Sequence, residues 1–224
     1  MFGKNASTGS ALSGQRTRIG GTALAISVAT AAVLASVVPA AQASEHHHDR
    51  TPQCRGESVD PAALIRYKTD VFIKAPLSTV FKVQTDVERW PSWQKPVLSM
   101  KLLDPGHLRP GSRFRWTTPA PPTPTTPAST LTITSTVEQI KKNDCILWSG
   151  PAIGAGVRID QGVHLWKFTK VRGGVHVHTE ETWTGRQVEA DVPTARRLLG
   201  DGLEQWLLDL KATAEARTPT HPRV

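Results

Sequence analysis

The sequence has little of what cofactor-dependent enzymes require. It contains only two cysteines and one tyrosine in 224 residues, and it has no glycine-rich phosphate loop, spaced Cys/His zinc set or nucleophile elbow. No internal repeat is present either. These absences argue against P-loop nucleotide chemistry, zinc-finger architecture, α/β-hydrolase chemistry and repeat folds, and we expect no cofactor and no metal site.

Basic residues outnumber acidic ones but are spread along the chain. Lys and Arg number 27 against 19 Asp and Glu, which gives a formal net charge of +8. The densest basic pairs are only Lys141-Lys142 and Arg196-Arg197, whereas nucleic-acid binding needs a basic patch or stripe. We therefore expect no nucleic-acid partner. With 38% hydrophobic residues, the chain can form one well-packed domain.

The first 43 residues have the pattern of an export signal. Basic residues precede an uncharged stretch over residues 19–38, and the small-residue pattern Ala41-Gln42-Ala43 follows. An uncleaved membrane anchor is the alternative, but the glycine, serine and threonine content of the stretch weakens insertion. We expect residues 1–43 to be a signal peptide cleaved after Ala43, a secreted or cell-envelope location, and no stable membrane insertion of the mature chain.

Polar segments are expected at both ends of the mature chain. Residues 44–63 contain Pro52 and Gly56, which predicts a flexible lead-in. The run His46-His47-His48 within it fits a solvated tail better than a metal site. Residues 218–224 are expected to form a short tail.

Cys54 and Cys145 are the only cysteines. An exported chain would place both where a disulfide can persist. A disulfide between them and two unrelated thiols are equally compatible with the sequence, because the lead-in could bring Cys54 to many places.

Hydrophobic periodicity predicts a strand, two short helices, six further strands and one long helix. Residues alternate with period two from Leu64 to Ile73 and then show helical spacing over 77–86 and 87–93. Strand character returns in the stretches 97–103, 112–118, 129–140, 145–150, 163–171 and 175–185. After Asp191, apolar residues recur every three or four positions, which predicts a long amphipathic helix.

This element order predicts the fold class. A curved antiparallel sheet has one face to bury, and only the C-terminal helix is long enough to cover it. The sequence therefore predicts an α+β fold in which about seven antiparallel strands wrap around a long C-terminal helix, with two short helices after the first strand.

Seven motifs, met in this order along the chain, carry a family resemblance. They are Ile73-Lys74-Ala75-Pro76, Val80-Phe81, Trp90-Pro91-Ser92-Trp93, Pro110-Gly111-Ser112-Arg113-Phe114, Leu147-Trp148-Ser149-Gly150, His164-Leu165-Trp166-Lys167-Phe168 and Glu181-Thr182-Trp183-Thr184-Gly185. Over residues 64–217 the chain resembles the START-like superfamily, also called the SRPBCC or polyketide cyclase/dehydrase family. The resemblance implies the helix-grip (Bet v 1/START-like) fold, with a cavity between sheet and helix that holds a hydrophobic small molecule or lipid. It implies no particular reaction.

The last hairpin predicts which side chains face this cavity. If Gly173-Gly174 form a two-residue turn, Arg172 lies opposite Val175 and the register of the two strands follows. The bulky even-numbered residues of the first strand then share a face with the odd-numbered residues of the second, and we expect this face to be the interior. The opposite face, expected to point to solvent, carries His176, His178 and Glu180.

Aromatic residues dominate the predicted interior. The candidates to line a ligand cavity are Trp93, Trp116, Trp148, Trp166, Phe168, Trp183 and Trp206. So many rigid rings around one helix pack poorly without gaps or a ligand, which favours cavity lining for the set. For any single tryptophan, a plain aromatic core is the better interpretation.

His164 and Glu181 are two ionisable residues on the same predicted face, where they are diagonal neighbours across the strand pair. They are the candidate catalytic residues and also candidate ligand-binding residues. Buried together, they could share a proton, orient a polar head group, or act as acid and base on a bound carbonyl compound. The alternative is a structural hydrogen-bonded pair. Without a nucleophile or metal cluster, structure or ligand orientation is favoured over catalysis.

Three loops are expected to crowd one rim of the sheet and form the mouth of the cavity. They cover residues 119–128, 151–161 and 186–190. Prolines stiffen the first loop, while Gly154 and Gly156 make the second pliable.

The leading functional hypothesis is binding or transport of a hydrophobic or amphipathic small molecule, lipid- or polyketide-like, in an internal cavity outside the cytoplasm. One alternative is a cyclase-, dehydratase- or aromatase-like enzyme on a free polyketide-type carbonyl substrate, with Glu181 as base and His164 as acid. A second alternative is a cell-envelope interaction module that uses the proline-rich loop. The sequence leaves the oligomeric state open.

Overall fold

The computed structural model describes residues 52–124 and 126–218. The expected signal peptide, the histidine run and residues 219–224 of the tail lie outside the described residues. Within the described part, no helix is long and apolar enough to cross a membrane.

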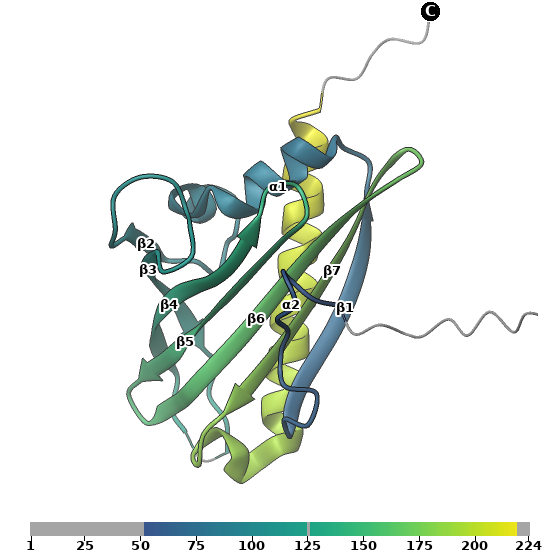
Figure 1. The fold of residues 1–224 in the computed structure, drawn as a ribbon. Coiled ribbons are helices and arrows are strands. Elements are labelled where there is room, and N and C mark those ends of the chain that lie inside the picture. Colours follow the sequence, from purple (N-terminus) through teal and green to yellow (C-terminus); the bar gives the residue numbers. More distant parts are fainter. Residues whose placement is uncertain (1–51, 125, 219–224) are drawn as a thin grey trace, which may run out of the picture. The chain divides into compact units, whose positions relative to one another are not determined.

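A single seven-stranded antiparallel sheet organises the described chain, with strand order β1-β7-β6-β5-β4-β3-β2. The elements in chain order are β1 (Ile65–Ile73), α1 (Leu77–Thr85), η1 (Val87–Ser92), β2 (Ser99–Leu102), β3 (Arg113–Ala120), β4 (Ser129–Lys141), β5 (Cys145–Gly154), β6 (Val157–Val171), β7 (Gly174–Thr184), η2 (Val188–Asp191) and α2 (Val192–Ala216). Figure 1 shows α2 running along one face of the curved sheet. The predicted α+β class and helix-grip fold are confirmed.

Local sequence signals determine where α2 begins and which of its faces packs against the sheet. The Asp191 side chain accepts a hydrogen bond from the Thr194 N–H at 3.1 Å, and Pro193 occupies the first turn, where no backbone donor is needed. The buried stripe contains Ala195, Leu199, Leu203, Trp206, Leu207, Leu210 and Ala214. Gly200 lets α2 approach β1 closely, because a Cβ there would lie 2.8 Å from Tyr67 Cε2.

The β6–β7 hairpin turns at Arg172-Gly173, since Val171 pairs with Gly174. The expected turn at Gly173-Gly174 is therefore wrong, and the register differs by two residues. Gly173 adopts a φ of +83°, whereas a Cβ at Gly174 would lie 2.2 Å from the Ile73 carbonyl oxygen. The second glycine thus permits close strand approach. Because side chains alternate with period two, a two-residue shift leaves each one on its expected face.

The β5–β6 hairpin is longer than the sequence indicated. β5 continues to Gly154 and β6 begins at Val157, so the expected pliable loop over 151–161 is wrong. Gly156 has a φ of +73°, a conformation that glycine adopts without strain. The glycines here therefore mark a tight turn between two strands.

Residues 52–63 pack on the outer face of the sheet, and we call them the N-terminal strap. Cys54 forms a disulfide with Cys145 at the start of β5. A small apolar cluster holds the strap in place and contains Cys54, Val59, Cys145, Leu147 and Leu165. The expectation of a flexible lead-in is thus wrong for these residues. Their sequence lacks periodicity because the disulfide of Cys54 and one further buried side chain, Val59, position them.

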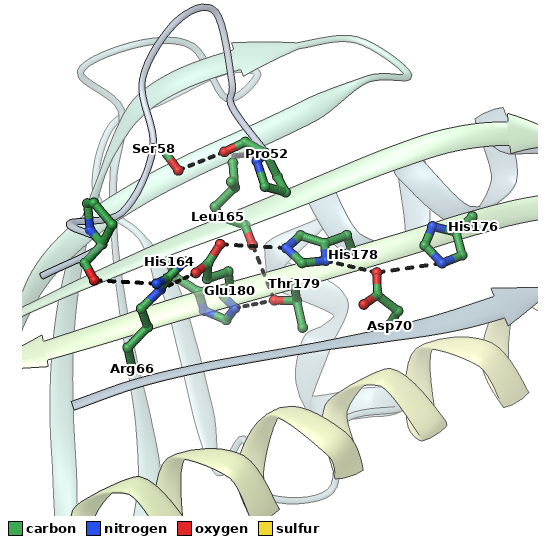
Figure 2. Close-up of polar contacts among 11 residues, drawn as sticks. Pro52, Ser58, Arg66, Asp70, His164, Leu165, His176, His178, Thr179 and Glu180 are labelled. Atoms are coloured by element: carbon green, nitrogen blue, oxygen red, sulfur yellow. Dashed lines mark hydrogen bonds and ion pairs between the residues drawn. The ribbon is translucent and has the colours of Figure 1, made fainter. Parts of the chain in front are cut away.

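The outer face also carries a polar network, drawn in Figure 2. Glu180 was expected to point to solvent, but it is fully buried, so that expectation is wrong. Arg66 forms an ion pair with Glu180 and donates to the Pro61 carbonyl of the strap at 3.4 Å. Burial opposes ionisation of Glu180, but the His178 imidazole, whose Nε2 lies 3.7 Å from Glu180 Oε2, and the hydrogen bond from Arg66 outweigh this effect and hold its pKa below the usual range.

Removing the disulfide should destabilise the domain. The double variant Cys54→Ser, Cys145→Ser loses a cross-link across a sequence separation of 91 residues. The chain-entropy relation assigns such a cross-link roughly 4–5 kcal/mol of stabilisation. Urea denaturation should show this loss, and a reducing agent should destabilise the wild type without affecting the double variant further. Identical midpoints for the oxidised wild type and the double variant would contradict this role.

Candidate functional site

Aromatic rings from three parts of the fold meet between the sheet and α2. This aromatic cluster consists of Trp90, Phe114, Trp116, Trp148, His164, Trp166 and Trp206. η1 supplies Trp90, α2 supplies Trp206, and the strands β3, β5 and β6 supply the others. The strand residues converge because alternate side chains of each strand face α2.

Trp90 lies at the centre of the aromatic cluster. Its ring centroid is 4.9 Å from that of Trp206, 5.6 Å from that of Phe114 and 5.7 Å from that of Trp148. These are separations of direct ring contact, which spans about 4.5–7 Å. The Trp90 indole N–H donates to the Gln84 carbonyl at 2.9 Å. The rings therefore fill much of the space that they were expected to line.

Five of the predicted site residues join this cluster, namely Trp116, Trp148, His164, Trp166 and Trp206. Phe168 lies further along β6 in edge contact with Phe81 at 5.4 Å, and Trp93 is half-buried against the same core. Sequence reasoning missed Trp90. The signal was its three-residue spacing from Val87, since both residues are on the buried side of η1.

Two hollows on the described surface lie outside the aromatic cluster. One, of about 350 Å³, lies where the β6–β7 turn meets the start of α1. The other, of about 670 Å³, lies between the first residues of β6 and the β7–η2 connection. Neither hollow is lined by a residue that the sequence identified as a ligand contact.

His164 and Glu181 lie directly opposite each other on β6 and β7. His164 Nδ1 is 3.0 Å from Glu181 Oε2, so the expected diagonal neighbours are in direct contact because of the two-residue difference in register. The Trp183 indole N–H donates to Glu181 Oε1 at 2.7 Å. On the far side of the imidazole, Nε2 is 2.8 Å from Thr179 Oγ1. Figure 2 draws this contact between His164 and Thr179.

Burial shifts the two pKa values in opposite directions. It raises the pKa of Glu181 to about 7, against a smaller lowering effect of the Trp183 hydrogen bond. It lowers the pKa of His164 to about 3. Between these values the pair consists of a neutral carboxylic acid and a neutral imidazole. The Glu181 side chain is 18% exposed and that of His164 only 4%, so Glu181 is the member that a molecule from solvent can reach.

Gly162 leaves a methyl-sized space beside Glu181. Gly150 on β5 pairs with Gly162 on β6, and Gly162 pairs with Trp183. A Cβ at Gly162 would lie 3.4 Å from Glu181 Oε1, so the space before this oxygen depends on a missing side chain. Gly150 leaves no such space, because a Cβ there would lie 1.9 Å from the Thr134 carbonyl oxygen of β4, but its own carbonyl oxygen borders the space at Gly162. We define the Glu181 site as Gly150, Gly162, His164, Glu181 and Trp183.

The Glu181 site offers proton transfer and hydrogen bonding beside an aromatic wall. A carboxyl group with a pKa near neutrality can donate or accept a proton at physiological pH. The adjoining indole rings can hold an apolar ring system. Among residues 52–124 and 126–218, no group of three or more His, Cys, Asp or Glu side chains is arranged to hold a metal ion.

The chain matches a known family over most of its length. Residues 65–215 match the family described as "Polyketide cyclase / dehydrase and lipid transport". The protein belongs to this family, and the resemblance carried by the sequence motifs is confirmed. No curated protein matches the chain significantly.

Solved structures share the fold at low sequence identity. A START superfamily protein from Mycobacterium smegmatis has a TM-score of 0.54 at 13% identity, over 68% of this chain and 99% of its own. The protein TTHA0849 from Thermus thermophilus has a TM-score of 0.54 at 17% identity, over 69% of this chain and 99% of its own. The di-domain ARO/CYC BexL from the BE-7585A biosynthetic pathway has a TM-score of 0.53 at 18% identity, over 70% of this chain and 50% of its own. Such similarity shows the fold alone.

Trp90→Ala should be among the most destabilising single substitutions in the domain. The ring is fully buried and contacts four other rings, so its removal should cost about 3–5 kcal/mol in urea denaturation. Trp93→Ala is the matched control, since Trp93 is half-buried, and it should cost less than half as much. Equal losses would contradict the central position of Trp90.

Glu181→Gln should remove a pH-dependent part of the stability. Folding raises the pKa of Glu181 from 4.5 to about 7. Folding therefore favours the protonated form, so this contribution is fully present below the unfolded pKa and is lost as the pH rises through the folded pKa. The stability of the wild type relative to Glu181→Gln should fall by on the order of 3 kcal/mol between about pH 4.5 and pH 8.

Urea denaturation of both proteins at several pH values measures this difference. Glu88→Gln, at an exposed position of η1, is the control and should show no such trend. A difference that is constant, or that grows as the pH rises, would contradict the buried setting of Glu181.

Proposed function

We propose that the protein binds a hydrophobic or amphipathic small molecule between its sheet and α2, outside the cytoplasm. The observation that carries this proposal is the Glu181 site, where a carboxyl–imidazole pair adjoins the aromatic cluster and the space left by the missing side chain of Gly162. Membership of a family whose description includes lipid transport supports the same class of ligand.

The arrangement of the Glu181 site and the aromatic cluster suits a ligand with one polar end and one apolar part. Its polar end would meet Glu181, the partly exposed member of the pair, and its apolar part would contact Trp183 and the neighbouring rings. A large guest needs the aromatic cluster to open, because its rings are in contact. Trp90 is the cluster ring that comes from neither the sheet nor α2. A displacement of η1 would therefore open the interior without breaking a strand pairing.

The disulfide supports a location outside the cytoplasm. Disulfides persist in oxidising compartments and are rare in the cytosol, and Cys54 is joined to Cys145 here. The export signal expected over residues 1–43 agrees with this location. Export of a ligand carrier would place binding in the medium or the cell envelope.

A second candidate function is acid–base catalysis on a carbonyl compound. The specific observation in its favour is a carboxyl group with a pKa of about 7 in contact with an imidazole. With a pKa of about 3, His164 is neutral at physiological pH and is a poor acid. Glu181 would therefore both accept and return the proton, which differs from the division of roles expected from the sequence. Consumption of an added carbonyl compound that ceases in Glu181→Gln would support this candidate.

Native mass spectrometry of the protein secreted by its own host tests binding and export together. We expect a mass corresponding to residues 44–224 with one small molecule per chain, released on denaturation. Glu181→Gln should lower the bound fraction, and Glu88→Gln should not. A chain that carries no guest and binds no added aromatic probe would contradict binding, and retention of residues 1–43 would contradict export by a cleaved signal.

A further inference from the structure

The Glu181 site is built for one chemical class of ligand. We propose that it binds ligands through an uncharged hydroxyl group, as in a phenol, an enol or an alcohol, and that it excludes carboxylates such as fatty acids. This inference rests on the function proposed above and specifies the ligand class at the same site. It follows from counting hydrogen-bond donors and acceptors around Glu181.

Thr179 determines which nitrogen of His164 carries a proton. A hydroxyl group has one proton to donate, and Thr179 Oγ1 donates it to the Leu165 carbonyl at 3.2 Å. The contact of 2.8 Å between Thr179 Oγ1 and His164 Nε2 therefore needs the imidazole proton on Nε2. Figure 2 shows this chain of contacts on β6 and β7. In the neutral ring, Nδ1 is then an acceptor.

Glu181 supplies the proton that this acceptor needs. His164 Nδ1 and Glu181 Oε2 are 3.0 Å apart, and two acceptors at that distance require a proton between them. The carboxylic acid form of Glu181 donates it from Oε2, in agreement with the raised pKa of this group. The pair thus holds a proton between its two members and carries no net charge.

The other carboxyl oxygen offers a ligand an acceptor. Glu181 Oε1 accepts the Trp183 indole N–H at 2.7 Å, and a carboxyl oxygen can accept a second hydrogen bond. The space before Oε1 is the space that the missing side chain of Gly162 leaves. A ligand group placed there must bring a donor. A hydroxyl group does so, whereas a carboxylate brings only acceptors.

No positive charge in the described interior would compensate a carboxylate. The buried polar and charged residues of the described chain include neither lysine nor arginine. Arg66 lies on the outer face, where it pairs with Glu180. The hydroxyl of Tyr67, the neighbour of Glu181 on β1, is bonded to Glu204. An unpaired carboxylate in this setting is strongly disfavoured.

Three naphthalene probes of equal ring size test the proposal. Calorimetric titration of the purified protein at about pH 6 compares 2-naphthol, which donates a hydrogen bond, with 2-methoxynaphthalene, which does not, and with 2-naphthoate, which is ionised. We expect 2-naphthol to bind roughly 10- to 100-fold more tightly than 2-methoxynaphthalene. Binding of 2-naphthoate should be weaker still.

Each result decides between the two proposals. If 2-naphthoate or 2-methoxynaphthalene binds as tightly as 2-naphthol, the selectivity for hydroxyl groups is overturned while small-molecule binding stands. If none of the three probes binds, both proposals are overturned. The expected order of affinities supports both.

Two glycine substitutions locate the binding event. Gly162→Ala places a methyl group 3.4 Å from Glu181 Oε1, in the space assigned to the ligand hydroxyl, and should weaken 2-naphthol binding at least roughly tenfold. Gly202→Ala is the matched control, because nothing lies within 4 Å of the added carbon, and it should leave the affinity unchanged. Equal affinities for both variants would overturn the assignment of the hydroxyl to this space.

The position of the proton on the His164 imidazole can be measured directly. Nitrogen NMR of histidine-labelled protein should show His164 as the neutral Nε2–H tautomer at about pH 6. Thr179→Val removes the hydroxyl that fixes this tautomer and should shift the signal, whereas Thr179→Ser keeps the hydroxyl and should preserve it. An imidazolium, or a proton on Nδ1 with Nε2 bare, in the wild type would overturn the assignment.

Discussion

The antiparallel pairing of β6 with β7 places the residues on which the site depends. Successive residues of a strand face opposite sides of the sheet, so Glu180 and Glu181 enter different environments. Glu181 faces the aromatic interior, where burial raises its pKa to about 7. Burial also opposes ionisation of Glu180 on the outer face, but the nearby His178 imidazole and the hydrogen bond from Arg66 hold its pKa below the usual range. The pKa values of two identical side chains, one residue apart, are thus shifted in opposite directions because only Glu180 has partners that favour its charged form.

The alternation of side chains made the interior face of the sheet predictable from the sequence, and the family motifs made the fold predictable. Contacts between segments that are distant in the sequence could not be predicted. The turn position was wrong by one residue, which changes the register by two, because Gly173 and Gly174 both fit a hairpin turn and the approach of β1 to Gly174 distinguishes them. An even shift preserves the faces, so His164 and Glu181 were found even though their register was wrong. The burial of Glu180 was missed because the strap that packs on its face lies far away in the sequence.

Whether the tryptophans line a cavity or fill it depends on how closely their rings approach one another, which the amino-acid composition does not determine. Alternation placed Trp116, Trp148 and Trp166 on the interior face, and either arrangement satisfies that pattern. Trp90 decides the outcome, because it enters from η1 and contacts rings from both the sheet and α2. The only periodic signal in η1 is the single three-residue step from Val87 to Trp90, which is too short by itself to predict that Trp90 contacts both layers. The filled interior therefore depends on a local geometry that the sequence pattern does not specify.

Burying His164 and Glu181 together has a large desolvation cost compared with filling the same space with apolar side chains. Two apolar side chains of similar volume would serve packing as well or better, because buried ionisable pairs recover their desolvation cost only with good geometry. Here the pair lowers that cost by remaining neutral, with Thr179 and Trp183 satisfying its outer atoms. The remaining acceptor of Glu181 points to the space that Gly162 leaves free. A purely structural pair would gain nothing from an acceptor that faces a position without a side chain, whereas a binding site requires one.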